Sequence, residues 1–289
     1  MQTPMHNQIC IVTGATSGMG KATAAALAQK GATVILIARD QRKGETVRDA
    51  IRTQSGNKNV EVMIADLASQ HAIRGLVQTF KQQYQQLHVL VNNAGGVFFK
   101  RETTVDGLEM TLAVDHLAYF LLTNLLLDTL KTSGPARIIN VSSNAERVGR
   151  VNFADLQRQK RYNGFLAYAQ AKLANMLFTY ELDRRLTGTG VTVNAVTPGP
   201  VATNFASGGH GLFKLFPLIF RFGKPAAEGA QTAIYLASSP HVEGVTGRAF
   251  YNCKELQSSR RSHDIGLQQQ LWQVSEELTG IGGTRRIPG

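Results

Sequence analysis

The 289-residue chain is 43% hydrophobic and 18% charged, which gives enough apolar material for a sizeable core and excludes a disordered protein. Lys and Arg outnumber Asp and Glu by 31 to 20, but the basic residues come in short groups without interleaved aromatic residues, so we expect no nucleic-acid partner. The N-terminus lacks the apolar run of a signal peptide or membrane anchor, which predicts a cytoplasmic protein with no integral membrane segment.

Short β-branched runs alternate with longer amphipathic stretches along the first half of the chain. The runs ICIV, VILIA, VEVMI and HVLVN are predicted strands, and stretches of helical length separate them. Such alternation is typical of right-handed βαβ units in a parallel sheet. VILIA and HVLVN are apolar throughout, as expected for strands covered by helices on both faces.

The alternation continues in the second half of the chain. We expect helices near 106–131, 164–186 and 225–238, and strands at ARIINVSS, VTVNAVTPG and GRAFYN. The chain is therefore predicted to form a single α/β domain over 1–289, a Rossmann-type doubly wound parallel sheet of about seven strands with helices on both faces. Cys10 and Cys253 lie in or beside strand-like runs, where buried reduced thiols are expected rather than a disulfide.

The first predicted strand leads through TGATSGMG directly into a helix, which places Gly14, Gly18 and Gly20 at a strand-to-helix turn. Glycines at such a turn let the backbone approach a pyrophosphate closely. The N-terminus of the helix adds unpaired N–H donors and the positive end of the helix dipole. This context predicts a dinucleotide-binding loop.

The end of the second strand indicates which dinucleotide is bound. An acidic residue there would hydrogen-bond a ribose 2′-hydroxyl, but the chain has Ala38 followed by Arg39, whose guanidinium can pair with a 2′-phosphate. The sequence therefore favours NADP(H). Lys43 and Lys21 can add positive charge near the phosphates, although a solvated surface lysine is an equally good interpretation of each.

Tyr168 and Lys172, in YAQAK, lie four residues apart in a predicted helix, so their side chains share one face. An ammonium group near a phenol stabilises the phenolate and lowers the phenol pKa from about 10 toward working pH. A tyrosine so placed can exchange a proton with an alcohol or carbonyl oxygen.

These motifs occur in the order found in a known superfamily: TGATSGMG at 13–20, NNAG at 92–95, NVSS at 140–143, YAQAK at 168–172 and PGPVAT at 198–203. In them the chain resembles the short-chain dehydrogenase/reductases over essentially its whole length. Segments such as DGLEMTLAVDHLAYFLLTNLLL at 106–127 and LWQVSEELTG at 271–280 resemble the retinol dehydrogenase group in particular. The resemblance implies an NADP(H)-dependent oxidoreductase that moves a hydride between nicotinamide and a carbonyl or alcohol carbon of a lipophilic small molecule.

The resemblance also assigns roles to residues. Tyr168 would be the general acid/base, Lys172 would tune it and hold the nicotinamide ribose, and Ser143 would polarise the substrate oxygen. An alternative for Ser143 is a hydroxyl that only caps backbone at the end of a strand. The predicted catalytic residues are Ser143, Tyr168, Lys172 and Asp115. The predicted cofactor residues are Gly14, Thr16, Ser17, Gly18, Met19, Gly20, Arg39, Lys43, Asp66, Leu67, Asn93, Ala94, Gly95, Tyr168, Lys172, Pro198, Val201 and Thr203.

Asp115 marks a departure from the family pattern. Where the family usually carries VNHLGHF, this chain has VDHLAYF, and the family's Asn helps to position a water that links the lysine to solvent. A carboxylate accepts those hydrogen bonds but cannot donate when ionised, so we expect the proton relay to persist with an altered pH profile. The neighbouring His116 is expected to be buried and hydrogen-bonded rather than to face the pocket.

The segment 204–224 is unusually apolar for a connection, and it follows Thr203. We interpret it as a substrate lid over the nicotinamide side of the cleft, with an amphipathic membrane-contacting helix and a subunit contact as alternatives. The residues predicted to contact the substrate are Ser143, Phe205, Leu212, Phe213 and Phe216. The resemblance also allows a homo-oligomer.

The seven histidines lack metal-ligand spacing, so no metal site is predicted. A second class of function is a non-catalytic NADP(H)-binding sensor or scaffold that keeps the fold without turnover. Because both Tyr168 and Lys172 are present, the sequence favours the enzyme.

Overall fold

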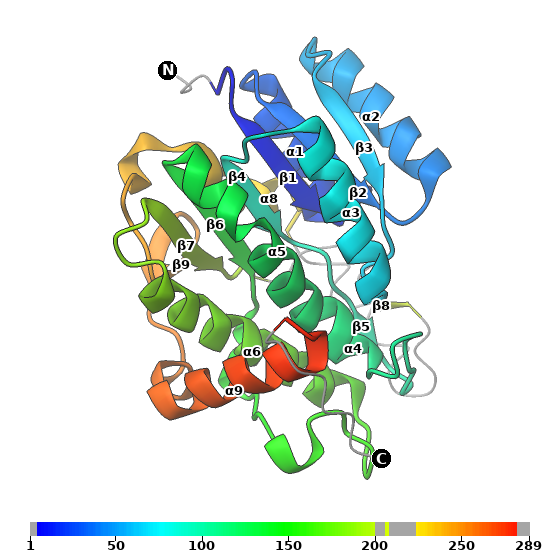
Figure 1. Cartoon of the computed structure of the whole chain (residues 1–289), viewed down its shortest axis with the longest axis vertical. Helices are drawn as coiled ribbons and strands as arrows, with labels where there is room; N and C mark the ends of the chain where they lie inside the picture. The colour runs from blue at the N-terminus through cyan, green and yellow to red at the C-terminus, as the bar shows by residue number, and fades with distance from the viewer. Residues whose placement is uncertain (1–4, 200–205, 208–223, 282–289) are drawn as a thin grey trace.

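The computed structural model describes residues 5–199, 206–207 and 224–281. An eight-stranded sheet forms its centre (Figure 1). In chain order the strands are β1 (Ile9–Thr13), β2 (Thr33–Ala38), β3 (Val60–Ile64), β4 (Val89–Asn92), β6 (Ala136–Val141), β7 (Val191–Val196), β9 (Arg248–Tyr251) and β10 (Lys254–Leu256). They lie side by side in the order β10-β9-β7-β6-β4-β1-β2-β3.

The strand pairing confirms the predicted doubly wound parallel sheet. Seven strands pair in parallel, and these are the seven expected from the sequence. The eighth, β10, was not predicted, because its three residues KEL are too short and polar to give a strand pattern; it pairs antiparallel to β9 at one edge. The strand order reverses between β1 and β4, and the carboxyl ends of strands at such a switch point are where open α/β sheets bind ligands.

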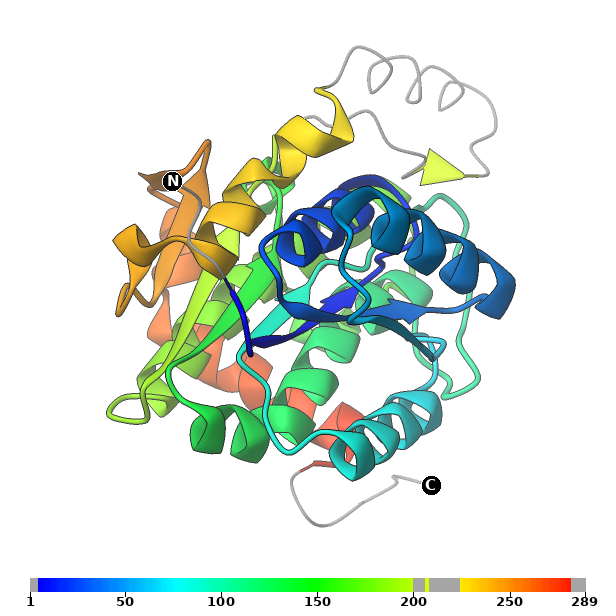
Figure 2. The same cartoon turned by 90° about the horizontal axis from the view of Figure 1, so that it is seen from above.

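Helices cover both faces of the sheet (Figure 2). One face carries α1 (Gly18–Gln29), α2 (Gln41–Ser55) and α8 (Ala226–Ser238), whose apolar side chains join one core cluster. The other face carries α3 (Gln70–Gln83), α5 (Ala118–Ser133) and α6 (Gly164–Arg185), which form a second core cluster. The last helix, α9 (Ile265–Thr279), packs on α6 and contributes Trp272 to that second cluster.

The helix expected near 106–131 begins later than predicted and is not uniform. The Glu109 side chain accepts hydrogen bonds from the N–H groups of Thr111 and Leu112, and so begins the short helix α4 (Met110–Leu112). A π-helical turn, η1 (Ala113–Leu117), follows before α5. Single π-helical turns inside α-helices are frequent at functional sites, and this one contains Asp115.

Within the described part of the chain, one helical stretch, Met110–Ser133, is long and apolar enough to cross a membrane. In this structure 72% of the most apolar 18-residue part of this stretch is buried inside the protein. Leu121, Leu122 and Leu126 of this stretch belong to the core cluster against the sheet. The stretch therefore has the burial of a core helix.

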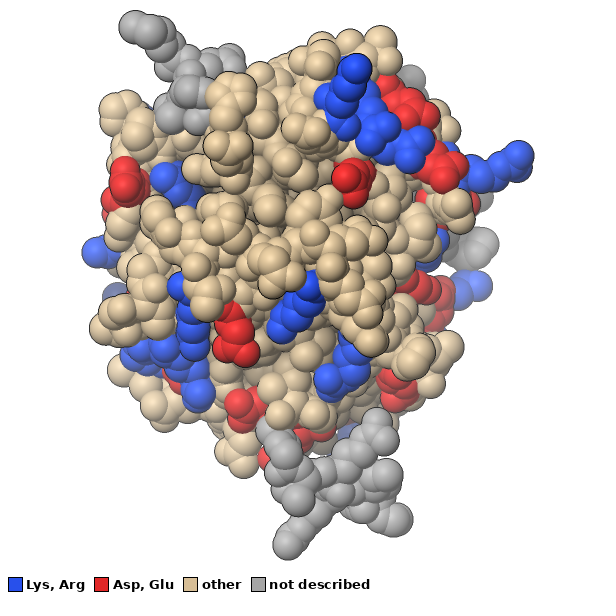
Figure 3. All heavy atoms as spheres, turned by 45° about the horizontal axis from the view of Figure 1, so that its top comes forward, with Lys and Arg blue, Asp and Glu red and all other residues tan. Residues whose placement is uncertain are grey.

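The distribution of surface charge and the state of the two cysteines can also be described. On the face seen in Figure 3, Lys and Arg lie among acidic residues rather than in one continuous patch. Cys10 is fully buried and Cys253 is half-buried, and both are free thiols. Burial raises the pKa of the Cys10 thiol to about 12. The thiol of this β1 residue is therefore unreactive and contributes to packing.

Candidate active site

The glycine loop joins β1 to α1 at the switch point of the sheet. Gly14 has φ +63°, and a Cβ added there would lie 2.9 Å from the Cα of Ala94. A Cβ at Gly20 would collide with the carbonyl of Gly14 and the amide of Asn93. α1 begins after Ser17, whose side chain makes no capping hydrogen bond, and its first turn holds no acidic residue. The loop therefore presents backbone N–H groups and positive helix-dipole charge, which suits a pyrophosphate.

The NNAG segment after β4 is tied to the glycine loop by Thr13. The Thr13 hydroxyl accepts hydrogen bonds from the backbone N–H of Asn93 at 2.8 Å and of Ala94 at 3.0 Å. The Asn93 side-chain amide donates to the Thr13 carbonyl at 2.8 Å. Gly95, which follows, is exposed. The predicted cofactor residues of these two segments are thus brought together along one edge of the sheet.

The residues expected around the adenosine end lie along the same edge. Arg39 follows β2 and is exposed, and Asp66 follows β3 and is exposed as well. Asp66 also accepts a hydrogen bond from the N–H of Ala68 at 3.0 Å, whereas Leu67 packs against the core. Lys43 is an exposed residue in the first turn of α2. Pro198, which the resemblance places near the nicotinamide and not the adenosine, is half-buried beyond the end of β7.

Three of the predicted catalytic residues meet where β6 ends beside α6. Tyr168 and Lys172 lie one turn apart on α6, and Tyr168 is 9% exposed. The hydroxyl of Ser143, just beyond β6, is hydrogen-bonded to the Tyr168 phenol. Ser143 also accepts from the N–H of Ala145 at 3.2 Å, so it caps backbone and contacts Tyr168 at once. The Lys172 ammonium lies 5.3 Å from the centroid of the Tyr168 ring.

Asp115 completes this group from the opposite side. Its Oδ2 atom lies 3.2 Å from the Nζ atom of Lys172, and the two side chains are 0% and 2% exposed. Its Oδ1 atom accepts a hydrogen bond from the N–H of Gly96 at 2.9 Å. Burial raises the pKa of Asp115, while the Lys172 ammonium and the Gly96 N–H oppose that rise. Asp115 therefore links Lys172 to the backbone beside the NNAG segment.

The pKa of Tyr168 differs from the expectation. Burial raises the pKa of the phenol, the hydrogen bond from Ser143 counteracts this, and the negative charge of Asp115 adds to the rise. The Lys172 ammonium, on which the expected lowering depended, is paired with the Asp115 carboxylate. The expectation from the sequence took account of the lysine but not of the burial of the phenol or the counter-charge of Asp115.

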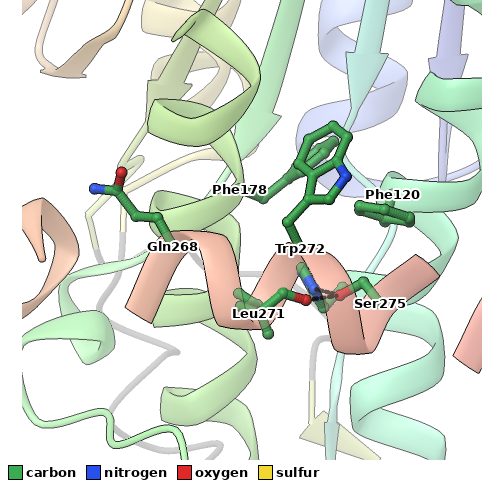
Figure 4. Close-up of a pocket in the computed structure, with 7 residues that line it drawn as sticks. Phe120, Phe178, Gln268, Leu271, Trp272 and Ser275 are labelled. Carbon is green, nitrogen blue, oxygen red and sulfur yellow. Dashed lines mark hydrogen bonds between the residues drawn. The ribbon is translucent and has the colours of Figure 1, made fainter. Parts of the chain in front are cut away.

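His116 is buried and hydrogen-bonded, as expected. Its Nδ1 atom lies 3.2 Å from Asn175 Oδ1 and its Nε2 atom 3.1 Å from Ser275 Oγ on α9. Burial lowers the pKa of His116 to about 4, so the imidazole is neutral at physiological pH. The small pocket beside it is enclosed by Phe120, Phe178 and Trp272 and has no room for a water-sized molecule (Figure 4).

Two residues that the sequence analysis did not single out support the site. The Tyr119 hydroxyl donates to the Ala94 carbonyl at 2.7 Å, and its ring centroid lies 5.7 Å from Lys172 Nζ. The Asn175 amide donates to the main-chain carbonyl of Asp115 at 2.8 Å. Their spacing held a signal, since Tyr119 lies four residues after Asp115 and Asn175 three after Lys172.

Part of the predicted site lies outside the described residues, namely Val201, Thr203, Phe205, Leu212, Phe213 and Phe216. Of the lid segment 204–224, Ala206–Ser207 form the short strand β8, which pairs in parallel with β5 (Val97–Phe98). β5 follows the NNAG segment directly. The chain after β7 therefore returns to the edge that carries the predicted cofactor residues.

Within the described ranges, no group of three or more His, Cys, Asp or Glu side chains could hold a metal ion. Among the described residues, the charged pair beside Tyr168 is formed by Asp115 and Lys172, which are in contact with each other.

Comparison with known proteins agrees with this geometry. A family profile described as short chain dehydrogenase matches residues 8–209. Retinol dehydrogenase 12 of Homo sapiens is 44% identical over 277 residues, covering 96% of this chain and 88% of the relative. A crystal structure of an uncharacterized protein from Mycobacterium paratuberculosis is 34% identical with a TM-score of 0.79, covering 96% of both chains. An NAD(P)-dependent gluconate 5-dehydrogenase from Beutenbergia cavernae, with bound NADP at low occupancy, is 25% identical with a TM-score of 0.70, covering 87% of this chain and 97% of that one.

Proposed function

The chain belongs to the retinol dehydrogenase-like group of the short-chain dehydrogenase/reductases, and on that premise we propose that it is an NADP(H)-dependent oxidoreductase of lipophilic carbonyl compounds or alcohols. The observation that carries the proposal is the meeting of Ser143, Tyr168 and Lys172 beside the glycine loop and the NNAG segment. Tyr168 acts as the general acid/base. Such an arrangement supports proton donation by Tyr168 to a carbonyl oxygen beside a bound dinucleotide.

The bound dinucleotide supplies or accepts a hydride at the substrate carbon. In reduction, the Tyr168 hydroxyl gives its proton to the substrate oxygen, while the Ser143 hydroxyl donates a hydrogen bond to the same oxygen and stabilises the charge that develops there. In oxidation the Tyr168 phenolate takes the alcohol proton. Lys172 lies against the Tyr168 ring from the next turn of α6. Its ammonium would hold the nicotinamide ribose of a bound cofactor.

Two features support NADP(H) as the cofactor. β2 ends in Ala38 followed by the exposed Arg39, so no carboxylate stands where a ribose 2′-hydroxyl would be bound, and a guanidinium is available for a 2′-phosphate. The Beutenbergia cavernae structure with bound NADP shares the fold.

The name of the human relative supports a lipophilic substrate, since retinol is an apolar alcohol. We propose that the segment 204–224 closes over such a substrate, and the pairing of β8 with β5 supports this location. If small polar ketones are turned over better than bulky apolar ones, the segment is not an apolar lid. Flotation with liposomes and a measurement of molecular mass address the alternatives, a membrane contact and a subunit contact.

The decisive experiment mixes the purified protein with NADPH and a panel of lipophilic aldehydes, ketones and quinones, and follows the absorbance of the reduced nicotinamide. We expect turnover with apolar carbonyl compounds and its loss in Tyr168→Phe. Cofactor binding, followed by fluorescence of the reduced nicotinamide, should persist in that variant. Tight NADPH binding by the wild-type protein without turnover of any compound would identify a non-catalytic sensor or scaffold instead.

A further inference from the structure

The positive charge of Lys172 is compensated by the neighbouring carboxylate of Asp115. The Nζ atom lies 3.2 Å from the Asp115 carboxylate and 3.4 Å from the Val141 carbonyl, and both charged side chains are buried. Between buried groups, where water screens little, a carboxylate at this distance cancels most of the field that the ammonium projects to a phenol farther away. The Gly96 N–H, which donates to the other carboxylate oxygen, holds Asp115 in place.

Among the residues that the structure describes, the other titratable groups around the pair add no positive charge. On η1, His116 is neutral at physiological pH because burial lowers its pKa to about 4. On α5, burial and the charge of Asp115 raise the pKa of Tyr119, so this phenol is neutral as well. The Glu109 carboxylate, ahead of α4, raises the pKa of Asp115 and adds negative charge. Ser143 contributes a hydrogen bond to Tyr168 but no charge.

We propose that Asp115 is a positioning residue that neutralises Lys172 and thereby keeps the Tyr168 hydroxyl protonated at neutral pH. The site then donates a proton to a carbonyl oxygen without prior protonation, and it accepts one from an alcohol only in alkaline solution. This inference rests on the proposed role of Tyr168 as general acid/base. It adds that the site without substrate holds the proton needed for reduction. It assigns Asp115 an electrostatic effect, beyond its expected part in a proton relay.

Reduction and oxidation at this site each form as many bonds as they break. In reduction, the hydride forms a C–H bond at the carbonyl carbon, the O–H bond of Tyr168 breaks, an O–H bond forms on the substrate, and solvent later returns a proton to the phenolate. In oxidation, the substrate C–H and O–H bonds break, and the proton passes to a phenolate that must already exist. Hence kcat for reduction falls, and kcat for oxidation rises, as pH rises through the pKa of Tyr168 in the loaded enzyme.

The test compares the pH profiles of kcat for wild type and Asp115→Asn, measured for reduction and for oxidation. We use kcat because the overall equilibrium fixes the ratio of kcat/KM for reduction to kcat/KM for oxidation, and no substitution can change that ratio. Removing the carboxylate takes a negative charge away from the phenol, so we expect both pH limbs to move down by about 1 pH unit. Asp128→Asn, the same change at an exposed position of α5, is the control and should leave the profiles in place. Superimposable profiles for wild type and Asp115→Asn overturn the inference, as does wild-type oxidation whose kcat already reaches its plateau below neutral pH.

A titration without turnover separates this inference from the proposed function. The near-ultraviolet absorbance of tyrosinate is followed against pH for wild type and Tyr168→Phe, and the difference reports Tyr168 alone. We expect this phenol to ionise only in alkaline solution, and to ionise at lower pH in the Asp115→Asn background. If Asp115→Asn does not fold, the wild-type difference still decides, because ionisation at or below neutral pH contradicts the proposal. Undiminished turnover by Tyr168→Phe, in contrast, would remove the proposed function itself.

Discussion

The two halves of the candidate site are built from different materials. Around the glycine loop the contacts are made by the backbone, with Gly14 in a left-handed conformation and the N–H groups of Asn93 and Ala94 held by Thr13. Around α6 they are made by buried side chains, with Lys172 and Asp115 paired between η1 and α6. The first half needs particular residues because of their shape, and the second because of their charge. Substitutions in the two halves should therefore fail in different ways.

The largest effect is expected at the reacting proton. Tyr168→Phe removes the hydroxyl but keeps the ring, so the fold and the cofactor site should be preserved while kcat falls by about 10²–10⁴-fold, the usual contribution of general acid–base catalysis. Steady-state kinetics measures the loss, and urea unfolding checks that stability is unchanged. A fall in stability with turnover intact would mean that Tyr168 serves packing rather than chemistry.

A smaller effect is expected from the side chain proposed to read the cofactor. Arg39→Ala removes a charge-assisted contact with the 2′-phosphate, worth about 1.5–3 kcal/mol, so KM for NADPH should rise by about 10–150-fold. The value for NADH should stay the same, because NADH lacks that phosphate. Equal effects on both dinucleotides would show that Arg39 supports the loop and does not select the cofactor.

The backbone-built half is tested through Thr13. Thr13→Val leaves the N–H groups of Asn93 and Ala94 without their hydroxyl acceptor, which should lower the free energy of unfolding by about 1–3 kcal/mol and weaken NADPH binding. Urea unfolding and a binding titration measure the two effects. Thr13→Ser keeps the hydroxyl and should recover most of both; if it behaves like Thr13→Val, the methyl group rather than the hydrogen bonds matters.

The smallest effect is expected at Lys43. Its side chain is exposed, so any attraction to a phosphate is screened by solvent, and Lys43→Ala should raise KM for NADPH by no more than about fivefold. The increase should disappear at high salt. An effect as large as that of Arg39→Ala would show that Lys43 contacts the cofactor phosphate directly.

The sequence was most informative where one short motif determines one local structure. Glycine spacing predicted the loop after β1, and the alternation of apolar runs predicted the seven parallel strands. The four-residue spacing of Tyr168 and Lys172 predicted a shared helix face, which α6 provides. Each of these depends on local geometry and on residues close together in the chain.

What the sequence could not predict depends on contacts between distant residues. Nothing local shows that Tyr168 is buried or that Asp115 lies against Lys172, 57 residues later, so the direction of the pKa shift of Tyr168 was expected wrongly. The π-helical turn was missed because its residues, AVDHL, have no composition that distinguishes it from an α-helix. β10 was missed because its pairing partner, not its own sequence, makes it a strand.

The last helix has a consequence for how the protein is made. Ser275 on α9 lies 3.1 Å from His116, the neighbour of Asp115. The end of the same helix binds α3, where Arg74 and Gln70 donate to the carbonyls of Thr279 and Leu278. The glycine loop and the NNAG segment leave the ribosome long before α9, and the π-helical turn acquires its contact with Ser275 only after α9 has been synthesised. Nascent chains that stop short of α9 would thus lack this contact beside Asp115.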